Sequence, residues 1–324
     1  MAKTKAAIFS FVRLSENSMV ASVRIAYWLQ KQLKCDMTWQ GDIADMKPET
    51  LIIVNGAYGF SKFLEPLSVA IMAAKQVIWV QNDYTIIPPR TEGDAASPFR
   101  RAFVVRKADG KSDTIFWSTC EKWYERKGSH YVNWNQLTFD ETYDLKQIAK
   151  CRRTTDNDLF YYGSFRDGSG KSSRVPTFDR YFMKPVVKTV ISSPTDKFKE
   201  RYPDCDHHGA ITDSFFPVLG LHGLGLYIED RKSSEEFHSP ANRFYEMLSA
   251  GLPMVFQPEC GSMMRKAGFN PEPYYVEKAK DVAKMMARKE QIGKEQREAW
   301  ASDPKFFRSN LLNQLSTARK AAGL

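Results

Sequence analysis

The strongest candidate for a binding site is residues 242–253, NRFYEMLSAGLP. This segment places a glutamate within a helix-like pattern that ends at a glycine. The N-terminus of a helix presents unpaired N–H groups and the positive end of its dipole, and both suit a phosphate. Glu246, about one turn further on, could accept both hydroxyl groups of a ribose. The pattern therefore predicts a nucleotide site that includes Asn242, Arg243 and Glu246. The alternative is a capped core helix with one exposed glutamate.

A second candidate begins where an apolar strand, residues 159–162, ends at Gly163. A glycine directly after a strand lets a ligand approach the main chain closely. Guanidinium groups offer paired donors to a diphosphate, and three basic residues follow in the same loop: Arg166, Lys171 and Arg174. The alternative is a solvated loop, which the glycines and serines of residues 168–173 also favour. The chain has no GxGxxG and no GxxxxGK(S/T) motif, which disfavours a standard NAD site and a P-loop.

A candidate general base, Asp83, comes just after the third strand expected along the chain, residues 76–81. Ligands bind at the carboxyl ends of strands in parallel sheets, so this carboxylate is placed to act on a substrate. An inverting transfer to a hydroxyl group needs one carboxylate to remove the proton. Glu16, in the loop of residues 13–18, is the competing candidate. The alternative for Asp83 is an ordinary turn aspartate.

The chain is basic, because 47 Lys and Arg against 38 Asp and Glu give a formal charge of +9. Such a charge favours a polyanionic partner, and the alternative is a merely soluble basic protein. Basic and aromatic side chains interleave between positions 99 and 134, a composition suited to phosphate binding and base stacking. An aromatic core under a solvated basic surface would look similar. The candidate phosphate contacts are Arg100, Arg101, Arg106 and Lys107.

Several protein classes are disfavoured. Five scattered cysteines without a CxxC pair argue against a disulfide framework and a zinc ribbon. His207 and His208 are adjacent, so their side chains point apart, and we expect them in a surface turn rather than at a metal. No apolar run reaches the roughly 18–20 residues that span a bilayer.

Strands alternate with helices along both halves of the chain, which predicts an α/β protein with parallel sheets. The length of 324 residues suggests two domains. We place them at residues 1–145 and 156–295, with a polar linker at 140–157, and with C-terminal helices in residues 296–324.

Five segments resemble phage-type DNA glycosyltransferases that act on hydroxymethylated pyrimidines: residues 79–85 (WVQNDYT), 161–166 (YYGSFR), 189–194 (TVISSP), 226–230 (LYIED) and 242–253. The last segment is also typical of the wider GT-B class of glycosyltransferases. The resemblance implies a GT-B fold: two Rossmann-like domains that face each other across a cleft, with the last helix packing back on the first domain. Residues 1–145 would then bind the acceptor and residues 156–295 the nucleotide sugar.

The resemblance also implies a reaction. A hexose would pass from a UDP-sugar, UDP-glucose being the expected donor, to a base flipped out of double-stranded DNA. Glu246 would hold the ribose and Arg166 the diphosphate, with Gly163, Lys171, Arg174, Asn242 and Arg243 completing the donor site. No tightly bound cofactor is implied, and no motif requires a divalent metal. We expect a monomer without membrane contact, in the cytoplasm of an infected bacterial host if a phage encodes it.

Two other functions stay open at this point: a GT-B enzyme with a non-DNA acceptor, such as a cell-surface glycan or a small molecule, and a non-enzymatic nucleic-acid-binding module. The stereochemical course is open as well. Retaining GT-B enzymes often carry a second glutamate where this chain has His238, with Glu235 and Glu236 nearby.

Overall fold

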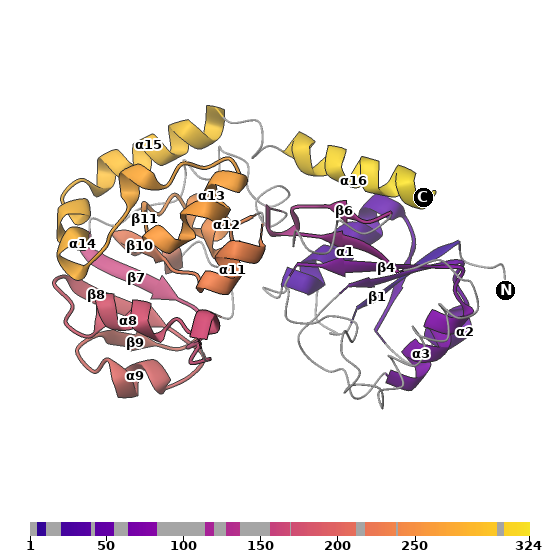
Figure 1. Ribbon diagram of the computed structural model, residues 1–324, viewed down its shortest axis with the longest axis horizontal. Helices are drawn as coiled ribbons and strands as arrows, with labels where there is room; N and C mark the ends of the chain where they lie inside the picture. Colours follow the sequence, from indigo (N-terminus) through magenta and orange to yellow (C-terminus); the bar gives the residue numbers. More distant parts are fainter. Residues whose placement is uncertain are drawn as a thin grey trace. The chain divides into compact units, whose positions relative to one another are not determined.

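The computed structural model describes residues 5–10, 21–39, 43–54, 64–82, 114–119, 128–136, 156–168, 170–211, 218–237, 239–302 and 308–324 (Figure 1). The chain forms two units. Unit 1 combines Met1–Trp134 with Leu311–Leu324, and unit 2 is the continuous segment Asn135–Asn310. Most of the linker expected at 140–157 lies outside the described residues.

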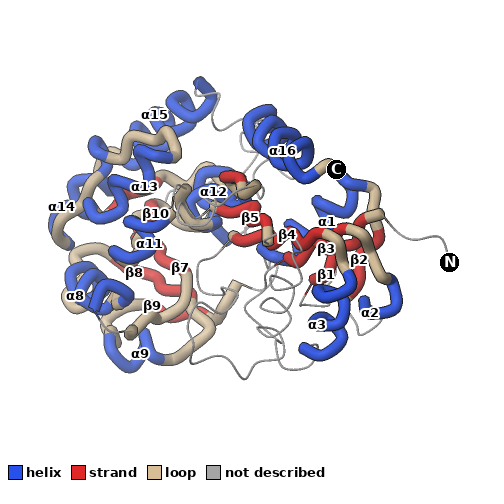
Figure 2. The backbone as a smooth tube through the Cα atoms, turned by 45° about the vertical axis from the view of Figure 1, so that its right-hand side comes forward, coloured by secondary structure: helices blue, strands red, loops and turns tan. Residues whose placement is uncertain are grey.

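Unit 1 contains a parallel sheet whose strands, among the described residues, run in the order β2-β1-β3-β4-β5-β6. The strands are β1 (Ala6–Ser10), β2 (Asp36–Thr38), β3 (Thr50–Val54), β4 (Gln76–Gln81), β5 (Ile115–Ser118) and β6 (His130–Tyr131). The central strands are buried along their length because helices cover both faces of the sheet. Helices α1 (Ala21–Leu33) and α16 (Arg308–Ala322) lie on one face, and α2 (Ile43–Met46) and α3 (Leu64–Ala73) on the other (Figure 1, Figure 2).

The C-terminal helix α16 belongs to unit 1, as the resemblance implies. The main-chain N–H of Asn133 donates a hydrogen bond to Oε1 of Gln314, at 2.9 Å. Leu311, Leu315 and Ala318 line the buried side of the helix. The two ends of the chain therefore build one unit.

Unit 2 contains a second parallel sheet, in the order β11-β10-β7-β8-β9. Its strands are β7 (Asp158–Tyr162), β8 (Lys188–Ser192), β9 (Asp206–His208), β10 (Leu224–Tyr227) and β11 (Met254–Phe256). Its α-helices are α8 (Val175–Phe182), α9 (Lys197–Arg201), α11 (Arg231–Glu236), α12 (Asn242–Ser249), α13 (Gly261–Lys266), α14 (Ala279–Met286) and α15 (Lys289–Ser302). Phe178 of α8 and Phe198 of α9 pack against Tyr161 of β7 in an aromatic cluster on one face of the sheet.

The strand orders locate the expected ligand edges. In unit 2 the chain runs outward from β7 through β8 to β9 and then returns to β10 on the other side of β7. Ligands of such sheets bind at the carboxyl ends of the strands, where the order reverses. In unit 2 this point lies just after Tyr162 and Tyr227. In unit 1 the order reverses between β1 and β3, and the segments that follow these two strands lie outside the described residues.

One local expectation is wrong. His207 and His208 lie in the edge strand β9, which pairs with β8, and not in a surface turn. The Nε2 atom of His207 lies 2.9 Å from the main-chain oxygen of Tyr202. Within the described residues, no helix is both long enough and apolar enough to cross a membrane.

Candidate functional site

The site in unit 2 is built where β7 and β10 end beside the first turn of α12. The first N–H groups of α12 have no preceding helical turn to bond, so they can serve an anion. The helix start is fixed from the sheet, because the N–H of Ala241 donates to the hydroxyl of Tyr227 at 2.7 Å. Tyr227 is the last residue of β10.

Glu246 lies in the middle of α12 and is only 3% exposed. The hydroxyl of Tyr162, the last residue of β7, donates a hydrogen bond to its Oε2 at 2.7 Å. Burial, and then the charge of Glu246, raise the pKa of Tyr162 well above its ordinary value. Tyr162 therefore keeps its proton and remains a donor to the carboxylate at any working pH.

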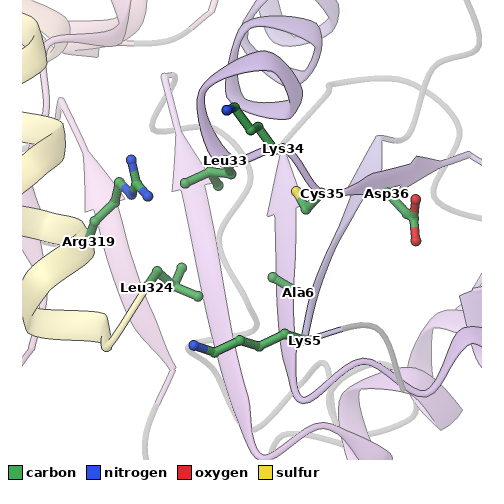
Figure 3. Close-up of a pocket in the computed structure, with 8 residues that line it drawn as sticks. All are labelled: Lys5, Ala6, Leu33, Lys34, Cys35, Asp36, Arg319 and Leu324. Atoms are coloured by element: carbon green, nitrogen blue, oxygen red, sulfur yellow. The ribbon is translucent and has the colours of Figure 1, made fainter. Parts of the chain in front are cut away.

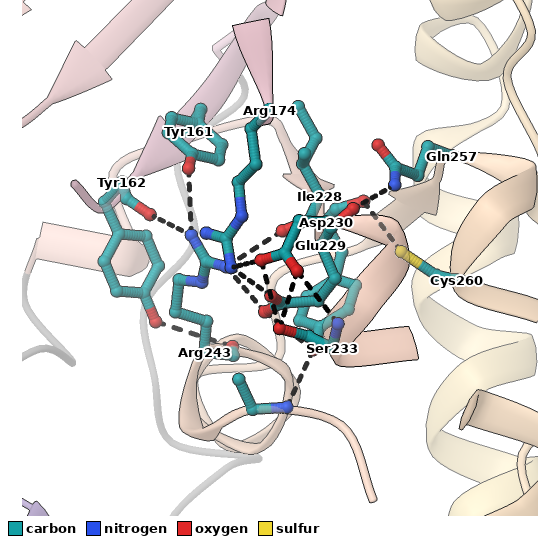
Figure 4. A network of polar contacts seen from close by, with 12 residues as sticks. Tyr161, Tyr162, Arg174, Ile228, Glu229, Asp230, Ser233, Arg243, Gln257 and Cys260 are labelled. Atoms are coloured by element: carbon teal, nitrogen blue, oxygen red, sulfur yellow. Dashed lines mark hydrogen bonds and ion pairs between the residues drawn. The ribbon is translucent and has the colours of Figure 1, made fainter. Parts of the chain in front are cut away.

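Arg243, one turn before Glu246, uses its guanidinium group to join both strand ends (Figure 4). Its Nη1 donates to the hydroxyl of Tyr161 at 3.0 Å and to the main-chain oxygen of Tyr162 at 3.1 Å. Its Nη2 donates to the main-chain oxygen of Ile228 at 2.9 Å and to Oε1 of Glu229 at 2.7 Å. The side chain is only 13% exposed, so this arginine is a buried link between the ends of β7 and β10.

Glu229 is the shared counter-ion of two arginines (Figure 4). Arg243 binds its Oε1, and Nη2 of Arg174 binds its Oε2 and also reaches Oδ2 of Asp230 at 3.2 Å. Burial alone would raise the pKa of Glu229, but the two guanidinium groups outweigh it and lower the pKa. Glu229 is therefore ionised at neutral pH and balances part of the positive charge of the two arginines.

Gly163 has a role that the sequence does not reveal. Its φ of +143° lies in a region that favours glycine, and a Cβ added there would lie 2.5 Å from Nη1 of Arg243. The space that sequence reasoning assigns to a ligand beside Gly163 is occupied by the Arg243 guanidinium. The glycine thus admits the arginine to the strand ends.

The predicted cations of this site differ in their surroundings. Arg174 is buried, and Lys171 is exposed and forms an ion pair with Glu235 at 2.9 Å. Arg166 is half-buried, and within the described part of the chain its guanidinium has no ion-pair or hydrogen-bond partner. Its charge helps to lower the pKa of Glu229, after the larger effects of burial, Arg174 and Arg243. Arg166 is therefore the predicted cation best suited to meet an incoming anion.

The remaining predicted site residues lie outside the described residues: Glu16, Asp83, Arg100, Arg101, Arg106, Lys107 and His238. Asp83 follows Asn82, the last residue described after β4. No cluster of three or more metal-binding side chains occurs in the ranges that the structure describes. Asn242 is the first residue of α12, and its Oδ1 is buried without a partner there.

Sequence reasoning missed Glu229, Tyr161, Tyr162 and Tyr227. The available signal was positional, because Glu229 begins an acidic pair just after an apolar strand, as Gly163 does after another. Which strand ends lie side by side depends on the sheet order, which only the structure shows.

A pocket of about 290 Å³ lies in unit 1, away from the carboxyl edge of its sheet (Figure 3). It is found at the amino ends of β1 and β2 and is lined by Lys5, Ala6, Leu33, Lys34, Cys35, Asp36, Arg319 and Leu324. Burial, and then the charge of Asp36, raise the pKa of Cys35 to about 11, so its thiol stays protonated at neutral pH. Nothing in this pocket resembles the ligand edge of a parallel sheet.

Two α/β units, each with a parallel sheet and interleaved helices, are the architecture of the GT-B fold. No protein-family model matches the chain, and no curated protein matches it in sequence. Solved structures do match. A DNA-modifying beta-glucosyltransferase, solved with and without uridine diphosphoglucose, is 14% identical with a TM-score of 0.67, over 98% of this chain and 99% of that one.

An alpha-glucosyltransferase is similar as well. Its complex with UDP and a 13-mer DNA containing a central A:G mismatch is 12% identical with a TM-score of 0.60, over 97% of this chain and 99% of that one. Its complex with UDP and a 13-mer DNA containing an HMU base is 11% identical with a TM-score of 0.57, over 98% and 100% of the two chains. At these identities the likeness establishes a shared fold.

Proposed function

We propose that this protein transfers glucose from UDP-glucose to a hydroxymethylated pyrimidine in double-stranded DNA. The observation that carries the proposal is the site at the order reversal of the second sheet, where the start of α12 and Glu246 lie beside the ends of β7 and β10. Arg166 follows β7 in the chain, and its charge acts on Glu229 in the same site. Two further observations support it. The chain is basic, and the similar structures include a DNA-modifying enzyme crystallised with uridine diphosphoglucose.

The donor is held in unit 2. Glu246 accepts the ribose hydroxyl groups, and the N–H groups at the start of α12, from Asn242 and Arg243, bind the diphosphate together with Arg166. Arg174 and Arg243 contribute to donor binding through their guanidinium groups, and Glu229 keeps these groups in place. Lys171 lies at the exposed side of the same loop, and Gly163 makes room for Arg243.

The acceptor is held by unit 1. Arg100, Arg101, Arg106 and Lys107 neutralise DNA phosphates, and the target base leaves the stack so that its hydroxymethyl group can reach the donor. In the transfer, the hydroxymethyl oxygen bonds to the anomeric carbon of the sugar while the bond from that carbon to UDP breaks. The acceptor proton passes to a base, and UDP leaves with the bonding electrons.

Asp83 is our candidate for that base, since it follows the end of β4. Asp83→Asn keeps the shape of the side chain but removes the base, so turnover should fall by roughly 10²–10⁴. Binding of UDP-glucose and of DNA, measured by calorimetry and by filter binding, should stay at the level of the unaltered protein. If more than about a third of the turnover remains, Asp83 is structural. Glu16, or a donor-phosphate oxygen in a retaining reaction, is then the base.

The proposed function is tested by measuring UDP release with a panel of nucleotide sugars under three conditions: with unmodified DNA, with hydroxymethylated DNA and without DNA. UDP-glucose with hydroxymethylated DNA should give the fastest release. Equal release under all three conditions would argue against DNA as the acceptor, and a screen of glycans and small molecules would follow. No release and no UDP binding would refute the donor site.

A further inference from the structure

The hydrogen bond between Tyr162 and Glu246 connects the end of β7 to the middle of α12. We propose that Tyr162 is a positioning residue that fixes the Glu246 carboxylate, so that the site selects ribonucleotide over 2′-deoxyribonucleotide donors. The inference rests on the proposed function, and it names a specificity determinant within that site.

A carboxylate on its own is poorly oriented. The terminal torsion of a glutamate side chain is broad, so its carboxylate plane is not set by the rotamer alone. The Tyr162 hydroxyl lies 2.7 Å from Oε2 of Glu246, which ties that plane to the end of the sheet. A carboxylate offers about four lone-pair positions, so the bond from Tyr162 does not by itself prevent the group from accepting the hydroxyl groups of a ligand.

Tyr162 is itself held rigidly. It is 8% exposed, and its ring stacks on Phe160 at 5.7 Å between centroids and 21° between planes. Phe160 in turn stacks on His222 at 3.8 Å and 5°. The main-chain oxygen of Tyr162 also accepts a hydrogen bond from Nη1 of Arg243. The hydroxyl is therefore presented from a fixed ring, and its raised pKa keeps it in the donor form.

A carboxylate held in this way can discriminate between sugars. A site that is built to hydrogen-bond a hydroxyl group rejects an analogue that lacks it, because a buried polar group is then left without its partner. Glu246 is almost fully buried, so the loss of the 2′-hydroxyl should weaken binding of 2′-deoxy-UDP by at least about tenfold relative to UDP. If Glu246 were free to turn, the ribose would gain less from the carboxylate and this ratio would shrink.

The test is isothermal titration of UDP and of 2′-deoxy-UDP into the full chain and four variants. Tyr162→Phe should weaken UDP binding by roughly tenfold and 2′-deoxy-UDP binding much less, so that the ratio of the two affinities falls toward one. Glu246→Ala should lower the ratio as well. Adding Tyr162→Phe to Glu246→Ala should then change UDP affinity little, since the tyrosine acts through the glutamate.

Tyr202→Phe is the matched control, because its hydroxyl also donates to a carboxylate, Oδ1 of Asp179 at 2.8 Å, but on the β9 side of the sheet. It should keep the unaltered ratio. If Tyr162→Phe also keeps that ratio while the unaltered protein prefers UDP, the positioning role is overturned and the proposed function stands. If the unaltered protein binds both nucleotides equally, the selectivity assigned to Glu246 and Tyr162 is overturned while the donor site stands. If it binds neither nucleotide, the donor assignment and the positioning role fail together.

Discussion

At the scale of single residues, the site depends on a buried carboxylate that serves two arginines. Glu229 is 3% exposed and binds Arg174 with one oxygen and Arg243 with the other. Burying charges costs free energy that close pairing offsets. The loss of Glu229 would remove a carboxylate from both arginines and leave Arg174 with Asp230. The loss of Glu229 should therefore lower the free energy of unfolding more than the loss of an exposed ion pair would.

Glu229→Gln tests this sensitivity. The variant leaves two buried guanidinium groups without their shared counter-ion, so the free energy of unfolding should fall by about 3–5 kcal/mol. Glu272→Gln is the matched control, because Glu272 forms an ion pair with Arg265 at 3.1 Å but is 61% exposed. Urea denaturation should show a change of no more than about 1 kcal/mol for the control. Equal effects of the two substitutions would show that the buried cluster does not stabilise the fold.

Part of this site can be predicted from the sequence, but the pairing of its buried charges cannot. Glu246 and Gly163 stand out because a helix start and a strand end mark them locally. The pairing of Glu229 with Arg174 and Arg243 depends on β10 lying beside β7, although 61 residues separate the end of one strand from the start of the other. Local patterns do not determine such a neighbour. The burial of Arg174, which in sequence looks like another cation of a basic loop, follows from the same pairing.

At the scale of elements, the site requires α12 to lie close against β10. Gly225 in β10 allows this approach, because a Cβ there would lie 2.6 Å from Sδ of Met247 and 3.0 Å from Cδ2 of Leu252. Met247 belongs to α12, and both side chains are buried. A side chain at position 225 must therefore displace the Met247 or Leu252 side chain, and Met247 belongs to the helix that carries Arg243 and Glu246.

Gly225→Ala should destabilise the protein by about 1–3 kcal/mol, as overpacking of a filled core does, and it should weaken UDP binding. Gly209→Ala is the control, because no atom lies within 4 Å of a Cβ added at Gly209. Thermal unfolding and UDP titration of both variants provide the comparison. Unchanged UDP affinity in a destabilised Gly225→Ala variant would mean that the helix tolerates the shift.

The amino edge of the same sheet should control acid stability and leave the site unaffected. Asp158, at the start of β7, accepts hydrogen bonds from His222 and from the N–H of Gly223, both at 2.7 Å. Burial alone would raise the pKa of Asp158, but these bonds outweigh it and lower the pKa. Because the folded pKa lies below the unfolded one, the stabilisation is complete above about pH 4 and is lost as the pH falls through the folded pKa.

Asp158→Asn should therefore flatten the fall in unfolding free energy on the acid side of pH 4, measured by urea denaturation at a series of pH values. Its UDP affinity at neutral pH should be unchanged, since the substitution lies at the opposite edge from the site. An acid limb as steep as that of the unaltered protein would contradict the role of Asp158.

The alternation of helices and strands is readable from the sequence, but two edge strands are not. β2 (Asp36–Thr38) and β9 (Asp206–His208) have three residues each and lack a continuous apolar run. They are strands because a buried neighbour, β1 or β8, offers them hydrogen-bond partners. Long buried strands such as β4 carry their own signal in six mostly apolar residues.

At the scale of the whole molecule, the formal charge of +9 is consistent with the polyanionic acceptor that we propose. Arg100, Arg101, Arg106 and Lys107 are expected to bind phosphates, whereas the described donor-site residues belong to unit 2. The two functions should therefore be separable by substitution.

Reversing the charges of Arg100 and Arg101 to glutamate should abolish DNA modification and leave slow hydrolysis of UDP-glucose intact. Each phosphate contact that is lost should flatten the salt dependence of DNA binding by about 0.9 in its logarithmic slope. Filter binding from low to high salt measures the slope, and UDP release without DNA measures the hydrolysis. Parallel loss of both activities would indicate a folding defect or a donor role for these arginines.

The central claim is that hydroxymethylated DNA receives a sugar from UDP-glucose, and the mass of the product nucleosides tests it most directly. The purified protein is incubated with UDP-glucose and a duplex containing hydroxymethylcytosine or hydroxymethyluracil. The DNA is then digested to nucleosides, whose masses are measured by mass spectrometry. We predict a new nucleoside that is heavier by one hexose and appears only when protein, donor and hydroxymethyl group are all present. Unchanged nucleosides from both duplexes, with a protein that still binds UDP, would contradict the account.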